Sequence, residues 1–186
     1  MSKKVLVPIA DGTEEIEAVC IIDTLRRAGA EVTVASVMEG RKQVKASRGV
    51  GLVADALISE CVEGHTWDLI ACPGGMPGAE HLRDCAPLVD LLKKQKAEGR
   101  IYAAVCASPA VVFEAHGLLE GEKATSYPAF QGKLSNLAEG RVVVSNKCVT
   151  SQGPGTSLEF ALKLAEVLFG EKVAKKHEAA MLVQVV

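Results

Sequence analysis

Aromatic side chains are scarce in this sequence. They make up only 4% of the 186 residues, although 48% of the residues are hydrophobic. The core must therefore consist of Val, Leu, Ile and Ala, which is typical of a parallel sheet covered by helices. A net charge of −2 leaves no basic surplus for nucleic acid or an acidic membrane surface, so we expect neither as a partner. No apolar run reaches the roughly 18 residues that a bilayer span needs.

Cysteine pairs and nucleotide-binding glycine patterns are also lacking. The six cysteines, at positions 20, 61, 72, 85, 106 and 148, contain no C-x-x-C pair, which excludes a zinc ribbon and a thioredoxin motif. Neither a P-loop nor a G-x-G-x-x-G pattern fits the glycines of residues 73–78. Residues 1–4 lead directly into a strand-like run rather than a signal sequence. We therefore expect a cytoplasmic protein with free thiols, although a transit peptide removed earlier would leave no trace.

Short β-branched runs alternate with helical patterns along the chain. The predicted strands cover 5–9, 31–37, 67–72, 100–105 and 123–128, with a hairpin over 142–151 and a short excursion within 40–58. The predicted helices cover 14–28, 86–98, 160–169 and 171–180, and a capping box is expected at 156–159. This order predicts a flavodoxin-like three-layer α/β/α sandwich with a mostly parallel sheet. The length suits one domain over residues 1–186.

The stretch 100–113 begins as a buried strand, passes through Cys106 and continues as an apolar helical pattern. Cys106 is thus predicted at a strand-to-helix turn, where the helix dipole and unpaired N–H groups favour a thiolate. Ala104 and Ser108 are small residues at the two positions that carry glycine in the G-x-S-x-G elbow of hydrolases. The alternative is a structural cysteine, because free cysteines usually pack as small hydrophobic residues.

Four candidate site residues other than the cysteine are predicted close to strand ends. Glu17 lies in the first helical turn after strand 5–9, Gly74 and Gly75 follow strand 67–72, and Tyr127 ends strand 123–128. Each has a structural alternative. Glu17 could be a solvated acid at the start of a helix, Gly74 and Gly75 could form a plain tight turn, and Tyr127 could be a packed ring. In a doubly wound sheet these ends border one crevice. Their convergence there favours a functional Cys106.

Apolar residues at positions 16, 19, 20 and 22 form a stripe on the first helix. We expect this stripe to mark the buried face, with Glu17 close to it. A carboxyl group so placed could aim into the crevice above the strand ends, where burial would raise its pKa and suit it to proton transfer.

Four ordered motifs together resemble the DJ-1/ThiJ/PfpI superfamily, with closest similarity to its DJ-1 branch. They are VPIADGTEEIE (7–17), PGG (73–75), AVCASP (104–109) and TSQGPGT (150–156), and the resemblance spans nearly the whole chain. It implies a homodimer of flavodoxin-like subunits without metal or nucleotide cofactor. It further implies that Cys106 is a low-pKa nucleophile, that Glu17 is its acid/base partner, and that the N–H groups of Gly75 and Ala107 form an oxyanion site.

The activities that this resemblance implies are a glutathione-independent glyoxalase, which converts methylglyoxal to lactate, and a protein deglycase. Redox sensing through oxidation of Cys106 to a sulfinate, and chaperone behaviour, are implied as the alternative from another functional class. The chain departs from the family at Tyr127, where many members carry His. Because a phenol is a poor base at neutral pH, we expect Glu17 to act as the general base instead. By resemblance, Ile16, Val19, Cys20 and the Arg26-Arg27 end of the first helix are expected at the dimer interface.

Overall fold

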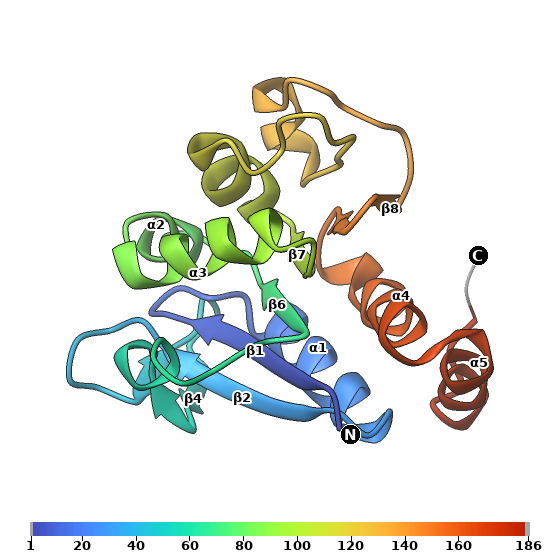
Figure 1. The fold of residues 1–186 in the computed structure, drawn as a ribbon, viewed down its shortest axis with the longest axis horizontal. Coiled ribbons are helices and arrows are strands. Elements are labelled where there is room, and N and C mark those ends of the chain that lie inside the picture. The colour runs from blue at the N-terminus through green and yellow to red at the C-terminus, as the bar shows by residue number, and fades with distance from the viewer. Residues whose placement is uncertain (1, 185–186) are drawn as a thin grey trace.

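The computed structural model describes residues 2–184, and a seven-stranded sheet forms its centre (Figure 1). The sheet has the strand order β5-β2-β1-β6-β7-β9-β8. All neighbouring strands pair in parallel except β8 and β9, which form the predicted antiparallel hairpin. These strands are β1 (Lys4–Ile9), β2 (Glu31–Ser36), β5 (Ala56–Leu57), β6 (Leu69–Cys72), β7 (Ile101–Val105), β8 (Val142–Ser145) and β9 (Cys148–Ser151).

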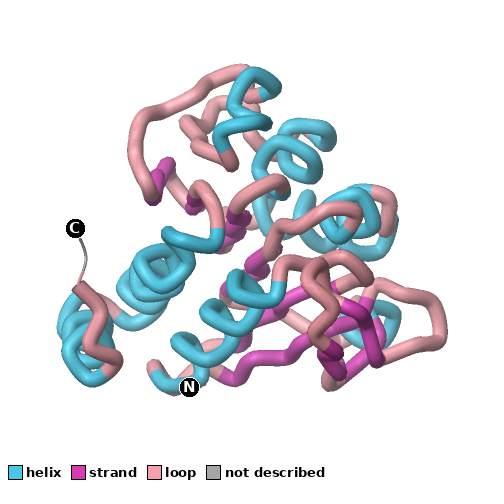
Figure 2. Tube along the Cα trace, turned by 180° about the vertical axis from the view of Figure 1, so that it is seen from behind, coloured by secondary structure: helices cyan, strands magenta, loops and turns pink. Residues whose placement is uncertain are grey.

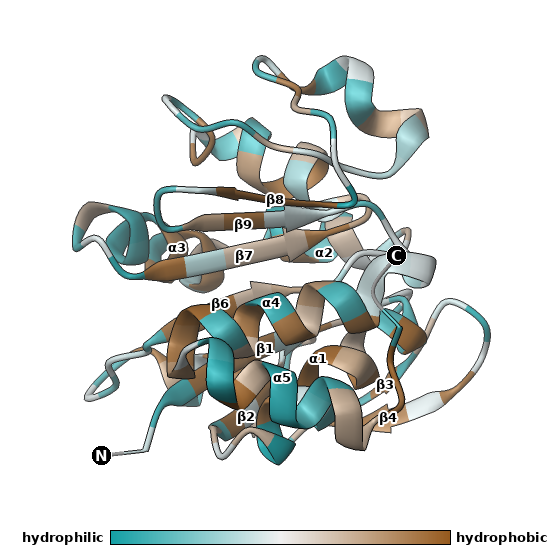
Figure 3. Ribbon diagram, turned by 90° about the vertical axis from the view of Figure 1, so that its right-hand side faces the viewer, coloured by the Kyte–Doolittle hydropathy of each residue, from teal (hydrophilic) through white to brown (hydrophobic). Residues whose placement is uncertain are grey.

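Helices cover both faces of this sheet. On one face α1 (Glu15–Arg27) packs against α4 (Ser157–Phe169), and α5 (Glu171–Ala180) lies outside α4. Figure 2 shows this side of the molecule, and Figure 3 shows α2 (Gly78–Arg83) and α3 (Ala86–Ala97) behind the strands. The arrangement confirms the predicted three-layer α/β/α sandwich. Within residues 2–184, no helix combines the length and apolar character needed to cross a membrane.

The core consists mainly of aliphatic side chains, as the composition predicts. Residues 5–7 and 9 of β1 and all four residues of β6 are at most 1% exposed, because helices cover both faces of these strands. The excursion within 40–58 contains β3 (Gln43–Lys45) and β4 (Gly51–Val53), which pair antiparallel in a small separate sheet. The turn between them contacts the start of α1, since Ser47 Oγ donates to Glu15 Oε2 at 2.8 Å.

The expected orientation of α1 is wrong. Ile16 and Val19, which were expected on the buried face, are 53% and 48% exposed. The buried side of the helix instead carries Ala18, Ile21 and Leu25, together with the carboxyl group of Glu17. The sheet and α4 contact this second stripe, so both sides of the helix are apolar. Glu17 is consequently part of the buried side rather than next to it.

Two predictions for the second half of the chain are also wrong. Residues 123–128 do not form a strand, because only Ala124 makes an isolated bridge, to Leu137, and a 3₁₀ helix begins at Pro128. The capping box at 156–159 does not form either. The Thr156 hydroxyl bonds to the backbone of Gly153, Glu159 pairs with Arg141, and α4 already begins at Ser157. The short helix α2 was not predicted.

Candidate active site

Cys106 occupies a backbone conformation that few residues other than glycine adopt. Its φ is +64°, at the sharp turn that follows β7. Two neighbouring segments hold this turn in place, since Cys106 N–H donates to the Ser151 carbonyl at 3.0 Å and Tyr127 N–H donates to the Cys106 carbonyl at 2.8 Å. The side chain is 9% exposed. The predicted strand-to-helix elbow is thus present, and its strained residue is the cysteine itself.

The loop after β6 approaches the elbow so closely that it requires glycine. A Cβ on Gly74 would lie 2.6 Å from Cys106 Cβ. Gly75 has φ +86°, and a Cβ there would lie 2.3 Å from the carbonyl oxygen of Gly12. Contacts this short would force the backbone apart. Backbone rather than side chains therefore lines this side of the cysteine.

Two backbone N–H groups act on the sulfur. They belong to Gly75, in the loop after β6, and to Ala107, directly after the elbow, and both lower the pKa of Cys106. N–H groups that converge on one atom from separate segments can stabilise a negative charge that develops beside it. The structure thus places both residues that sequence analysis proposed for an oxyanion site next to Cys106.

Glu17 is a fully buried carboxyl group on the same side of the elbow. Its Oε2 accepts a hydrogen bond from Gly74 N–H at 2.7 Å, and its Oε1 has no nitrogen or oxygen partner among the described residues. The Cys106 thiol faces this carboxyl group. Burial raises the pKa of Glu17 to about 7, although hydrogen bonds with Gly74 N–H and the Cys106 thiol lower it in part. A carboxyl group with such a pKa can both accept and donate a proton near neutral pH.

The pKa of the Cys106 thiol, expected to be low, is raised to about 12. Burial is the main cause, and the negative charge of Glu17 adds to it. The helical segment that follows the cysteine is a π-helical turn of five residues, Pro109–Phe113, so its dipole is short. The expectation is therefore wrong while Glu17 is ionised. When Glu17 holds the proton, the repulsion disappears and the carboxyl group can donate to the thiolate, so the two groups titrate as a pair.

Tyr127 adjoins the elbow through its backbone, while its side chain is 44% exposed. The ring of Tyr127 lies against Gly153, since a Cβ added to that glycine would be 3.3 Å from a ring carbon. The centre of the ring is 6.4 Å from the centre of the Phe130 ring. A cavity of about 170 Å³ opens there, lined by Tyr127, Pro128, Arg141 and residues 152–156. The tyrosine therefore borders the site and is not in the cluster around the sulfur.

Among residues 2–184, no histidine acts on the pKa of Cys106 or of Glu17. The Nε2 atom of His116 lies 2.8 Å from the Arg83 carbonyl oxygen, at the end of α2. Within the part of the chain that the structure describes, no three His, Cys, Asp or Glu side chains are placed to hold a metal ion. The chemistry of the cluster therefore rests on a thiol, a carboxyl group and backbone N–H groups.

One buried contact at the site was not predicted. Ser108 Oγ donates to the Pro73 carbonyl at 2.6 Å, which joins the elbow to the loop after β6. In the sequence Ser108 is notable only as a small residue in the elbow. Its partner is 35 residues away along the chain, so no local pattern could have identified the contact.

Comparisons with known proteins point to one family. The DJ-1/PfpI family model matches residues 3–167. Protein DJ-1 homolog B of Arabidopsis thaliana is 51% identical over 176 residues, which are 93% of this chain but only 40% of that protein. This chain thus spans less than half of that relative. The glutathione-independent glyoxalase DJR-1.2 of Caenorhabditis elegans is 36% identical over 173 residues, which cover 91% of this chain and 89% of that protein.

A solved structure of oxidized DJ-1 from Toxoplasma gondii superposes with a TM-score of 0.96. It is 59% identical, and the match covers 99% of this chain and 100% of that one. The structural match therefore extends over almost the whole chain. This chain belongs to the DJ-1/PfpI family.

Proposed function

We propose that the protein is a cofactor-independent glyoxalase, which converts methylglyoxal to lactate and glyoxal to glycolate without glutathione. The observation that carries the proposal is the cluster at the elbow. It combines a thiol, a buried carboxyl group whose pKa is about 7, and two N–H groups that act on the same sulfur. A small 2-oxoaldehyde needs a nucleophile, an oxyanion site and a group that moves a proton between carbon and oxygen. The family relative named as a glyoxalase supports this assignment.

In the first step Glu17 takes the thiol proton as the Cys106 sulfur attacks the aldehyde carbon. A carbon–sulfur bond forms, and the carbonyl π electrons move onto oxygen, where the N–H groups of Gly75 and Ala107 stabilise the charge. Protonation of this oxygen by Glu17 gives a hemithioacetal and returns the carboxylate. The side chain of Glu17 is suited to both transfers because its pKa is close to neutral.

In the second step the carboxylate of Glu17 removes the hydrogen of the former aldehyde carbon as a proton. The electron pair forms an enediolate with the neighbouring ketone carbon. Glu17 then returns its proton to that carbon, and the hydroxyl proton on the sulfur-bearing carbon passes to the oxygen of the neighbouring carbon. The product is a lactoyl thioester on Cys106, in which one carbon has been oxidised and its neighbour reduced. Water hydrolyses the thioester to lactate and restores the thiol, so no external oxidant or reductant is required.

The test is lactate production from methylglyoxal in the absence of glutathione. We expect turnover by the unmodified protein and loss of activity in Cys106→Ala and in Glu17→Ala. Cys85→Ala is a matched control, because this partly exposed thiol is at the start of α3 and outside the cluster. Undiminished lactate production by either of the first two variants would overturn the assignment. Release of lysine or arginine side chains from methylglyoxal adducts, measured on the same variants, would test the deglycase reaction.

Oxidation sensing is a second candidate, favoured by the same N–H groups and by the buried carboxyl group. Two equivalents of hydrogen peroxide would convert the Cys106 thiolate to a sulfinate and release two molecules of water. The N–H groups of Gly75 and Ala107 can donate hydrogen bonds to the oxygens of this sulfinate. Sulfinate formation under mild peroxide, with negligible turnover of methylglyoxal, would favour this role, and any chaperone behaviour would then be assayed in the oxidised form.

We also propose a homodimer formed through the exposed side of α1. Ile16 and Val19 project from this side, and Cys20 beside them is partly exposed. At the end of the helix, Arg26 and Arg27 pair with Asp55 and Asp23. An apolar stripe on a surface helix, opposite a stripe that already faces the core, is typical of an interface between subunits. The cytoplasm stays our prediction for the location of the protein.

A further inference from the structure

The peptide unit between Pro73 and Gly74 is held at both ends. Its carbonyl oxygen accepts the hydrogen bond from Ser108 Oγ at 2.6 Å, and its N–H donates to Glu17 Oε2 at 2.7 Å. Both side chains are fully buried. One continuous chain of hydrogen bonds thus runs from the serine hydroxyl, through a single peptide group, to the carboxyl group of the site.

The next peptide unit is held in the same manner. The Gly74 carbonyl accepts a hydrogen bond from Glu14 N–H at 3.0 Å, and the Gly75 N–H on the other side of this unit acts on the Cys106 sulfur. The carbonyls of Pro73 and Gly74 therefore each have a donor that fixes the direction of the N–H group on the same peptide unit. Glu14 does this with its backbone, but the first unit depends on a side chain.

Ser108 precedes the π-helical turn Pro109–Phe113, where a serine normally accepts a hydrogen bond from the helix backbone. No such capping bond is present, and the hydroxyl donates to Pro73 instead. The side chain is therefore used for the loop after β6 and not for its own helix.

We propose that Ser108 is a positioning residue for Glu17. Its hydroxyl holds the peptide between Pro73 and Gly74 so that the Gly74 N–H points at the carboxyl group and favours its ionised form. The consequence for turnover rests on the proposed glyoxalase function. The effect on proton binding by Glu17 does not require any substrate.

The physical basis is polarisation of the peptide group. A donor on a carbonyl oxygen draws electrons toward that oxygen, which makes the N–H of the same peptide a stronger donor, by about 10–30% per bond. A stronger hydrogen bond to a carboxylate stabilises the charged form and so lowers its pKa. Removal of the serine hydroxyl should therefore raise the pKa of Glu17 further above its ordinary value.

Few other titratable groups act on Glu17. Glu14, on the same helix, raises its pKa by charge repulsion, and Cys106 faces it from the end of β7. Cys20, one turn along α1, has its own pKa raised in part by the charge of Glu17. Ser108 does not titrate and none of these three groups is its hydrogen-bond partner, so the hydrogen bonds connect it to Glu17 through the peptide between Pro73 and Gly74.

The experiment follows the alkylation rate of Cys106 by iodoacetamide against pH, with the modified peptide quantified by mass spectrometry. The midpoint of its acidic limb reports the first proton lost by the pair of Glu17 and Cys106. In Ser108→Ala we expect this midpoint to rise by about half a pH unit. Ser108→Gly, which also lacks the hydroxyl and adds no atoms, should show the same shift, and Ser108→Thr should restore the original midpoint.

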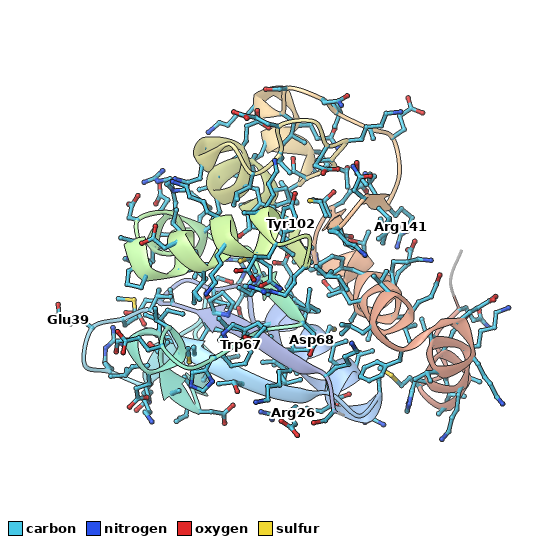
Figure 4. All side chains as sticks on the ribbon, viewed as in Figure 1. Arg26, Glu39, Trp67, Asp68, Tyr102 and Arg141 are labelled. Carbon is cyan, nitrogen blue, oxygen red and sulfur yellow. The ribbon has the colours of Figure 1, made fainter. Side chains whose placement is uncertain are left out.

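Tyr102→Phe is the matched control. This tyrosine, which lies in the interior on β7 (Figure 4), also donates a buried hydroxyl to a carbonyl, that of Leu118 at 3.0 Å. Its loss should lower the thermal unfolding temperature without a shift of the midpoint. An unchanged midpoint in both Ser108→Ala and Ser108→Gly, or an equal shift in the control, would overturn the proposal. Failure of the glyoxalase assignment is recognised separately, as absence of lactate production by the unmodified protein.

Discussion

Replacement of Glu17 by Gln should stabilise the protein at neutral and alkaline pH while it abolishes turnover. Burial raises the pKa of this carboxyl group from 4.5 to about 7. The folded state therefore binds the proton more tightly than the unfolded chain, and the stability contributed by proton binding is fully present below pH 4.5. It is lost as the pH rises to about 7.

The size of the effect follows from these two values. A difference of 2.5 pH units, from 4.5 to about 7, corresponds to about 3 kcal/mol at 1.36 kcal/mol per unit. Gln carries no charge at any pH, and its carbonyl oxygen can still accept the hydrogen bond from Gly74. At pH 8 we expect Glu17→Gln to raise the free energy of unfolding by up to about 3 kcal/mol, and to raise the melting temperature by roughly 6–12 °C. At pH 4 the gain should vanish.

The assay is thermal and urea unfolding of both proteins between pH 4 and pH 8. Glu15→Gln is the matched control two residues earlier. Although burial raises the pKa of Glu15, hydrogen bonds from the backbone and from Ser47 outweigh it, so the pKa is lowered. The ionised form of Glu15 therefore stabilises the folded state above the ordinary pKa of 4.5, and this stabilisation is lost as the pH falls below that value. At neutral pH we expect Glu15→Gln to be less stable than the unmodified protein. Equal stability of Glu17→Gln and the unmodified protein at pH 8 would refute the raised pKa.

Two further predictions concern the loop and the interface. In Gly75→Ala the added Cβ would meet a backbone oxygen at 2.3 Å, and we expect kcat/KM for methylglyoxal to fall about 100-fold or more through displacement of an N–H donor; Gly99→Ala, with φ +65° but open space around it, should be slightly destabilised and fully active. Val19→Glu should convert a dimer into a monomer in analytical ultracentrifugation. The matched control is Val53→Glu, which changes a 72% exposed valine on β4 and should leave the dimer intact. A monomeric unmodified protein would contradict the second prediction.

Much of the fold could be predicted because its signals are local. The β-branched runs and the turns at their ends suffice to identify β1, β2, β6 and β7, and the small residues on either side of Cys106 identify the elbow. The two-residue strand β5 was not predicted. Glu17 could also be placed at the site, since it follows the first strand by a fixed short distance. These features depend on neighbours in the sequence.

Other features depend on contacts that the sequence does not reveal. Ile16 and Val19 were expected on the buried side of α1 because the helix is apolar on two sides, and periodicity alone cannot tell which side meets the sheet. The segment 123–128 has residues that favour a strand, but its backbone bonds go to irregular neighbours such as Cys106 and Asn136. The pKa values of Glu17 and Cys106 depend on how deeply the two groups are buried and on the charge that each places beside the other, and no sequence motif shows either.

The most direct test of the account is the fate of methylglyoxal on Glu17→Gln. In this variant the thiol can still add slowly to the aldehyde, with water in place of Glu17 as the acceptor of the thiol proton, but an amide cannot remove the proton on carbon. Mass spectrometry of the intact variant, recorded in excess methylglyoxal, should show one added methylglyoxal that is absent when Cys106→Ala is combined with Glu17→Gln, and no lactate should form. Lactate production at the unmodified rate, or adducts on lysine and arginine with none on Cys106, would contradict nucleophilic catalysis by this cysteine.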